Sequence, residues 1–155
     1  MKRGGLLLLL ALLCGIPLRA EVDAYNVPKV VNSCIAGIQH RDFELSDRMN
    51  PFYLRGDFDG DRKEDYAVLI KQISSDKSGI LICFGGRRHH VRIGAGTPFV
   101  FEGLQFDNLE YFDAWDIEEP DADFPRDRIH LVAKESASGW IYWDGREFKW
   151  QQGAI

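Results

Sequence analysis

Tyr66 to Ile93 read YAVLIKQISSDKSGILICFGGRRHHVRI, and this stretch decides the fold. Aromatic and branched residues fill Tyr66–Gln72 and Ile80–Phe84, and the polar SSDKSG lies between the two runs. GGRR then separates the second run from a third, His89–Ile93. Branched and aromatic residues favour strands, whereas clusters of Gly, Ser and Asp favour turns. The stretch therefore predicts three consecutive antiparallel strands, which form a meander.

A second meander is predicted toward the C-terminus. Three more runs with the composition of strands follow one another there: Arg128–Lys134, Gly139–Trp143 and Glu147–Gln151. ESAS joins the first two runs, and Asp144-Gly145 joins the last two. The Asp-Gly dipeptide suits the positive φ angles of a tight hairpin, so the last two strands are expected to be neighbours.

An amphipathic helix is predicted ahead of the strands, from Val27 to about His40. Pro28 suits a first helical turn, and residues 41–51 have no hydrophobic period and predict a connection. Apolar residues recur at three- and four-residue spacing along the helix: Val27, Val31, Cys34 and Ile38. We therefore expect an α+β fold in which this N-terminal helix packs on an antiparallel sheet of about six or seven strands.

The segment Gly56–Ile70, GDFDGDRKEDYAVLI, has the spacing of a calcium loop. Calcium prefers several carboxylate oxygens at about 2.4 Å and often one peptide carbonyl, which Lys63 would supply at position 7. Four aspartates occupy positions 1, 3, 5 and 9: Asp57, Asp59, Asp61 and Asp65. The alternative is a metal-free acidic turn in which the same side chains bond nearby backbone amides.

This segment resembles the aspartate loop and following strand of FG-GAP and VCBS-type repeats and, more distantly, the calcium loops of dockerins and EF-hands. The resemblance implies that the four aspartates are metal ligands and that Tyr66–Ile70 is the strand that leaves the loop. It covers about fifteen residues, and Arg62 stands where the family has a glycine after the third aspartate. The repeats build propellers as arrays, but this sequence has no second copy, so we expect the loop without the propeller.

The N-terminus has the pattern of a secretory signal peptide. Lys2 and Arg3 form a cationic start, Leu6–Ile16 is apolar, and Pro17–Ala20 is a polar exit. Cleavage after Ala20 would leave a single globular domain, residues 21–155, in the periplasm or outside the cell. A retained membrane anchor and a lipid-carrying Cys14 are the alternatives, and the short apolar stretch disfavours stable membrane insertion.

Charge and cysteine content constrain the mature domain. Removal of residues 1–20 leaves 16 basic against 24 acidic residues, so the net charge moves from −5 to −8. Such a balance disfavours nucleic acid and anionic membranes as partners. The two remaining cysteines, Cys34 and Cys83, are expected to form a disulfide in an oxidising compartment, and two buried free thiols are the alternative.

A strongly acidic segment runs from Asp107 to Asp127. It holds nine acidic residues and one basic residue, interleaved with aromatic residues that need cover. It is either a long loop packed on the sheet by those aromatics or a docking surface for a basic partner. The residues expected at that interaction surface are Asp113, Trp115, Asp116, Glu118 and Glu119.

Catalytic motifs are not evident in the sequence. It contains no G-x-S-x-G and no H-E-x-x-H, and its four histidines are scattered. We therefore expect an exported binding or interaction module, stabilised by calcium, that acts on another envelope or extracellular protein, rather than an enzyme. A small hydrolase that uses a carboxylate pair and a purely structural envelope protein are the alternatives.

Overall fold

The computed structural model describes residues 27–38, 41–86, 89–101, 103–134 and 137–153. The predicted signal peptide lies outside the described residues. Among the helices described, none is both long and apolar enough to cross a membrane.

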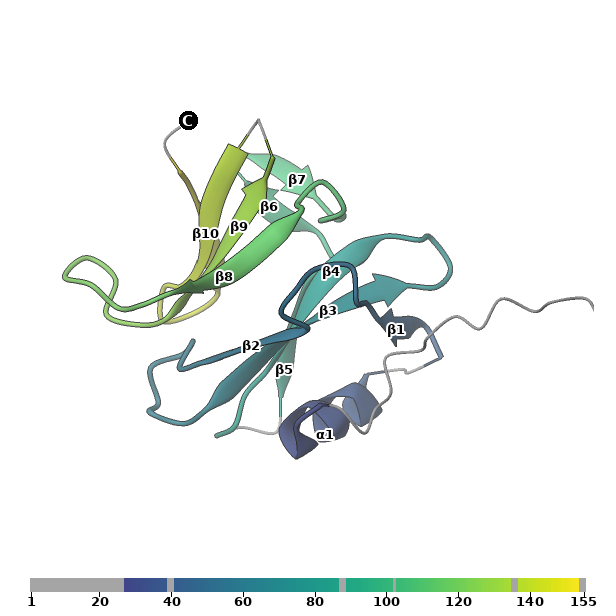
Figure 1. The fold of residues 1–155 in the computed structure, drawn as a ribbon, viewed down its shortest axis with the longest axis horizontal. Helices are drawn as coiled ribbons and strands as arrows, with labels where there is room; N and C mark the ends of the chain where they lie inside the picture. Colours follow the sequence, from purple (N-terminus) through teal and green to yellow (C-terminus); the bar gives the residue numbers. More distant parts are fainter. Residues whose placement is uncertain (1–26, 39–40, 87–88, 102, 135–136, 154–155) are drawn as a thin grey trace, which may run out of the picture.

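The chain folds into one helix and antiparallel sheets arranged in layers (Figure 1). The helix α1 (Lys29–Gly37) covers one face of a five-stranded sheet, and a four-stranded sheet lies on the other side of it. The prediction of an α+β fold dominated by antiparallel sheet is therefore confirmed.

The five-stranded sheet has the order β1-β3-β4-β5, and β2 also pairs with β3. Because β1 pairs with the end of β3 and β2 with its beginning, the two short strands share one edge of β3. The strands are β1 (Phe43–Leu45), β2 (Tyr53–Gly56), β3 (Asp65–Gln72), β4 (Ser78–Cys83) and β5 (His90–Gly94).

The four-stranded sheet has the order β11-β10-β9-β8, and a separate hairpin, β6 with β7, contacts β11. All pairings are antiparallel. The bounds are β6 (Phe99–Phe101), β7 (Leu104–Phe106), β8 (Ala114–Glu118), β9 (Arg128–Ala133), β10 (Ala137–Trp143) and β11 (Phe148–Gln152).

The central strands β3 and β4 contain the continuous apolar runs 66–70 and 80–83 because the five-stranded sheet is covered on both faces. In β3, Ala67 and Leu69 join the core cluster shared with the four-stranded sheet. Tyr66, Val68 and Ile70 alternate with them and belong to the cluster on the helix side. A half-solvated strand would alternate apolar and polar residues, whereas burial on both faces requires the continuous run.

The helix is shorter than predicted. It begins after Pro28, whose ψ of 150° is extended, and ends at Gly37, after which Ile38 is also extended. Val27 is therefore not helical, although it is buried, and the predicted end at His40 lies outside the described residues. Cys34 of α1 is bonded to Cys83 of β4, with their Cα atoms 5.8 Å apart, so the predicted disulfide is present and fastens the helix to the sheet.

The two predicted meanders are confirmed as β3-β4-β5 and β9-β10-β11, but six or seven strands was too low a number. The described residues form eleven strands. The additional five are short, and two of them lie in segments predicted to be connections or loops: β1 within residues 41–51 and β8 within the acidic segment. Strands of three to five residues carry little periodic signal. β1, β2 and β8 form because a longer neighbour offers its hydrogen-bonding edge, whereas β6 and β7 pair with each other.

Candidate functional site

The aspartate loop, residues 57–64, connects β2 to β3. Gly56 pairs with Asp65 across the two strands, so the loop closes a hairpin. Its backbone turns through two left-handed residues, Gly60 with φ 80° and Arg62 with φ 65°. Arg62 stands where the FG-GAP and VCBS-type loops have glycine. This loop therefore adopts the left-handed conformation without the residue type for which that conformation costs least.

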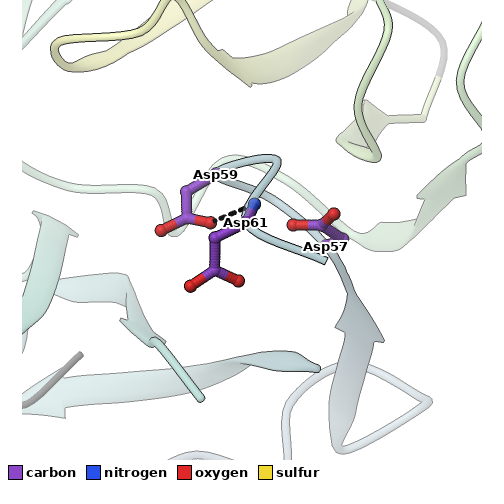
Figure 2. A group of neighbouring side chains, drawn as sticks. All are labelled: Asp57, Asp59 and Asp61. Carbon is purple, nitrogen blue, oxygen red and sulfur yellow. Dashed lines mark hydrogen bonds between the residues drawn. The ribbon is translucent and has the colours of Figure 1, made fainter. Parts of the chain in front are cut away.

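Three of the four predicted carboxylate ligands come together in this loop (Figure 2). Asp57, Asp59 and Asp61 each place one carboxylate oxygen within 4.8 Å of the others. Oxygens that share an ion at about 2.4 Å can be at most about 4.8 Å apart, so the spacing fits a single bound cation. The three carboxylates also repel one another when no cation neutralises them.

Backbone amides of the loop hold these carboxylates in place. Asp57 accepts hydrogen bonds from the amides of Gly60 (2.8 Å) and Arg62 (2.9 Å). Asp59 accepts from the Asp61 amide at 3.0 Å, and Asp61 accepts from the Lys63 amide at 2.9 Å. The same contacts would stabilise a metal-free acidic turn, so both interpretations of the sequence are compatible with this geometry.

Lys63 was expected to supply a carbonyl at position 7. The described contacts place its amide on Asp61, and its ammonium nitrogen lies 3.9 Å from Asp61 Oδ2. The Lys63 side chain is more than half exposed, so its ammonium group offsets only part of the negative charge of the loop.

Asp65, the predicted ligand at position 9, lies outside the three-carboxylate group. Its side chain is fully buried, with Oδ2 accepting from the Phe58 amide (3.0 Å) and Oδ1 from the Gly85 amide (2.9 Å). The pKa of Asp65 is raised to about 6, mainly by burial and in part by the charge of Asp59, while hydrogen bonds from backbone amides oppose the shift. The structure thus uses Asp65 to tie the loop to the turn after β4.

The loop is clamped from two sides by close backbone approaches. On one side, a Cβ atom at Gly85 would overlap the Glu64 carbonyl oxygen, and one at Gly86 would overlap Asp61 Oδ2. On the other side, Asp127 accepts a hydrogen bond of 2.7 Å from the Asp57 amide. The loop therefore joins the β4–β5 turn of one sheet to the β8–β9 connection of the other.

The clamping residues were missed by the sequence analysis. Asp127 lies 70 positions from Asp57, and Gly85 lies 20 positions from Asp65. The Gly85-Gly86 pair was interpreted only as a turn, and Asp127 only as the last acid of a charged segment. The adjacent glycines were the one local signal that could have indicated a close backbone approach.

The predicted interaction surface maps to β8 and its ends. Asp116 pairs with His130 at 3.0 Å, Glu118 lies 3.9 Å from Arg128, and Glu119 is exposed. Asp113 accepts a hydrogen bond from the Lys134 amide. Asp116 and Glu118 lie on the edge strand β8 and Asp113 and Glu119 flank it, and charges at a sheet edge also discourage unwanted pairing.

Trp115 does not belong to that surface, which corrects the prediction. Only 3% of it is exposed, and it lies in the core between the two sheets. Its indole N–H donates to the Pro51 carbonyl at 2.7 Å. Successive side chains of a strand point to opposite faces of the sheet. Ala114 and Asp116 face solvent, and Trp115 between them faces the core.

Comparison of the chain with family models, with curated proteins and with solved structures finds no match. The functional argument below therefore depends on the geometry of the described residues.

Proposed function

We propose that this protein is an exported binding module whose aspartate loop holds one calcium ion. The convergence of Asp57, Asp59 and Asp61 carries the proposal, because hard oxygen ligands at this spacing are what calcium prefers. The Lys63 carbonyl is the proposed fourth ligand. Asp65 supports the site from within the protein by holding the start of the loop.

The proposed role of calcium is structural. The loop touches both the β4–β5 turn and the β8–β9 connection, so a cation that fixes the loop also fixes the junction of the two sheets. Extracellular modules bind calcium with dissociation constants on the order of 0.1 to 1 mM, and calcium at about 1 mM would then stabilise the fold by about 0.4 to 1.4 kcal/mol.

Calorimetric titration of residues 21–155 with calcium tests this site. We expect heat of binding and a higher melting temperature with calcium, a weaker response with magnesium, and loss of both effects in Asp61→Asn. Asp123→Asn is the matched control, because it removes an exposed carboxylate outside the loop and should still respond. A melting temperature that calcium leaves unchanged in the unmodified protein would contradict the proposal.

Export is the second part of the proposal. A disulfide persists in oxidising compartments, and the Cys34–Cys83 bond is compatible with passage through one. We expect the secreted protein to begin at Glu21 and to contain no free thiol. Mass measurement before and after alkylation under non-reducing conditions checks both points, and a mature chain that still begins at Met1 would refute cleavage.

The proposed partner is a basic envelope or extracellular protein that contacts the edge strand β8. The exposed carboxylates of Asp116, Glu118 and Glu119 supply the negative charge for that contact. Retention of envelope proteins by the immobilised unmodified domain, and their loss with a triple Asn/Gln variant of these positions, is the expected result. Equal retention by both would place the contact elsewhere.

The carboxylate-pair hydrolase has less support from this geometry. Asp65 is the acidic group with the raised pKa, as expected of a general acid, and Asp59 is its charged neighbour. However, Asp65 has no exposed surface and both of its oxygens accept backbone amides, so a substrate cannot reach it. We explain its pKa by its structural role.

A further inference from the structure

A pocket of about 140 Å³ lies away from the aspartate loop, beside the β6–β7 hairpin and the end of β11. Its apolar wall also includes Leu109 and Ala137. Five aromatic residues line what we call the aromatic pocket: Phe99, Phe106, Tyr111, Phe112 and Trp150. A cavity of about 150 Å³ with apolar walls is large enough to hold benzene, so the volume suits one aromatic ring.

Hydrogen bonds to other parts of the protein hold one wall of the aromatic pocket in place. Arg48 donates to the carbonyls of Leu109 and Glu110, at 3.1 Å each. Asn108 Oδ1 accepts from the Ser78 amide at 2.8 Å. Segment 108–112 is therefore fastened to β4 and to the segment before β2, and its shape does not depend on a ligand.

The polar groups of the pocket are largely committed to the protein. Besides Asn108, the lining contains one more amide side chain, Gln152, whose side-chain oxygen accepts from the Trp150 indole N–H at 3.3 Å. The aromatic rings contact one another at the bottom and rim: Phe112 lies 5.4 Å from Trp150 and 5.8 Å from Tyr111, measured between ring centroids. A ligand in the pocket would thus contact mainly aromatic rings and aliphatic side chains.

Several charged groups of this region are bonded to other groups of the protein. Lys77 is paired with Asp107, Arg48 is bonded to wall carbonyls, and Asp113 accepts the Lys134 amide. A charged ligand would lose its hydration with no opposite charge among the lining residues. That loss costs several kcal/mol when an ion becomes buried, and a cation–π contact returns only about 0.5 to 2 kcal/mol.

We propose that the aromatic pocket is a binding site for a small neutral aromatic molecule. Ring-on-ring packing contributes about 0.5 to 1.5 kcal/mol per pair beyond the area that it buries, so an aromatic ligand binds better than an aliphatic one of the same size. Two of the walls, Phe106 and Tyr111, are 40% and 60% exposed, which gives a ligand access from solvent.

Three matched probes test the proposal: benzyl alcohol, cyclohexylmethanol and benzylammonium. Binding is followed by the NMR shift of the Trp150 indole N–H, in EDTA so that the result is independent of the calcium site. We expect benzyl alcohol to bind with a dissociation constant on the order of millimolar. Cyclohexylmethanol and benzylammonium are expected to bind at least threefold more weakly.

Two variants locate the binding. Tyr111→Ala removes one exposed wall and should weaken benzyl alcohol binding threefold to tenfold, while Ala137→Phe should fill the pocket and abolish it. Phe52→Ala, which removes an aromatic residue that is 51% exposed and does not line the pocket, should have no effect. Melting temperatures within 2 °C of the unmodified protein show that each variant is folded.

Each other outcome overturns the proposal. If none of the probes shifts the Trp150 signal at 20 mM, the pocket is not a site for single-ring ligands. If cyclohexylmethanol binds as tightly as benzyl alcohol, the site selects for apolar volume alone. If benzylammonium binds most tightly, the site prefers cationic ligands.

Discussion

Arg62 adopts a left-handed backbone that a side chain makes costly. With φ at 65°, its Cβ crowds the following carbonyl, whereas glycine has no such contact. We predict that Arg62→Gly raises the free energy of unfolding by about 1 kcal/mol, measured by urea denaturation in EDTA.

Lys63→Gly is the control for this prediction, because Lys63 is adjacent but does not have positive φ. It should destabilise the protein, since glycine adds freedom only to the unfolded chain there. If Arg62→Gly were also destabilising, the left-handed turn would not be strained in solution.

Asp65 makes stability depend on pH. Its pKa is raised from 3.8 to about 6, so the folded state holds a proton that the unfolded state has already released. Between about pH 4 and pH 6 the folded protein binds more protons, and stability therefore falls as pH rises and levels off above about pH 6. We predict a decline of roughly 2 to 3 kcal/mol across this window without calcium, measured by denaturation at each pH.

The variant Asp65→Asn identifies the group responsible. Asparagine cannot titrate, and its amide group can accept only one of the two backbone N–H bonds, so the protein should be less stable at every pH. Its stability should also lack the decline between pH 4 and pH 6. A variant that keeps the full decline would assign the effect to other carboxyl groups.

Short elements in this fold are defined by their neighbours. β8 lies in a segment that the sequence describes only as acidic and aromatic, and it becomes a strand because the edge of β9 is available to it. The β4–β5 turn is equally dependent on context: its glycines are needed because the aspartate loop passes against them. Composition alone indicates a turn at Gly85-Gly86, but it does not indicate that the aspartate loop packs against this turn.

The β4–β5 turn supplies a prediction about the loop that it supports. A Cβ atom at Gly85 would overlap the Glu64 backbone oxygen and push the loop away, so we expect Gly85→Ala to lower stability by about 1 to 3 kcal/mol. It should also weaken calcium binding. Denaturation and calorimetry of the same variant measure both effects.

Gly37→Ala provides the comparison, because a Cβ there would meet only ordinary contacts at 3.9 Å. It should leave stability within about 0.5 kcal/mol or raise it slightly. If both alanine variants behaved alike, the loop and the turn would not be as closely packed as described.

The disulfide acts on the whole molecule. α1 has nine residues, too few for a stable helix by itself, and it is held by its buried face and by the Cys34–Cys83 bond. The bond spans 49 positions, so its loss frees a long loop in the unfolded chain. We predict that Cys34→Ala with Cys83→Ala lowers the free energy of unfolding by about 3 to 4 kcal/mol.

Reduction of the unmodified protein should produce a similar loss, measured by denaturation with and without reductant. The disulfide joins the helix to the five-stranded sheet and not to the four-stranded one. The hydrogen-exchange protection of the four-stranded sheet should therefore fall less than that of α1. A loss below about 1 kcal/mol in both experiments would mean that the helix is held by packing alone.

The sequence alone was sufficient to predict both meanders and the pairing of Cys34 with Cys83. These features depend on local composition, on a small number of cysteines, or on spacing within a few residues. Asp57, Asp59 and Asp61 were predicted as a group for the same reason, since a tight turn brings neighbours together.

Only the tertiary structure decided the rest. It turned Asp65 and Trp115 inward, paired β1, β2 and β8 with longer strands, and assembled the aromatic pocket from four separate segments. Each of these outcomes depends on contacts between residues that are far apart in the chain. The free energy of burial and strand pairing is shared between both partners of a contact, so neither partner's sequence reveals it alone.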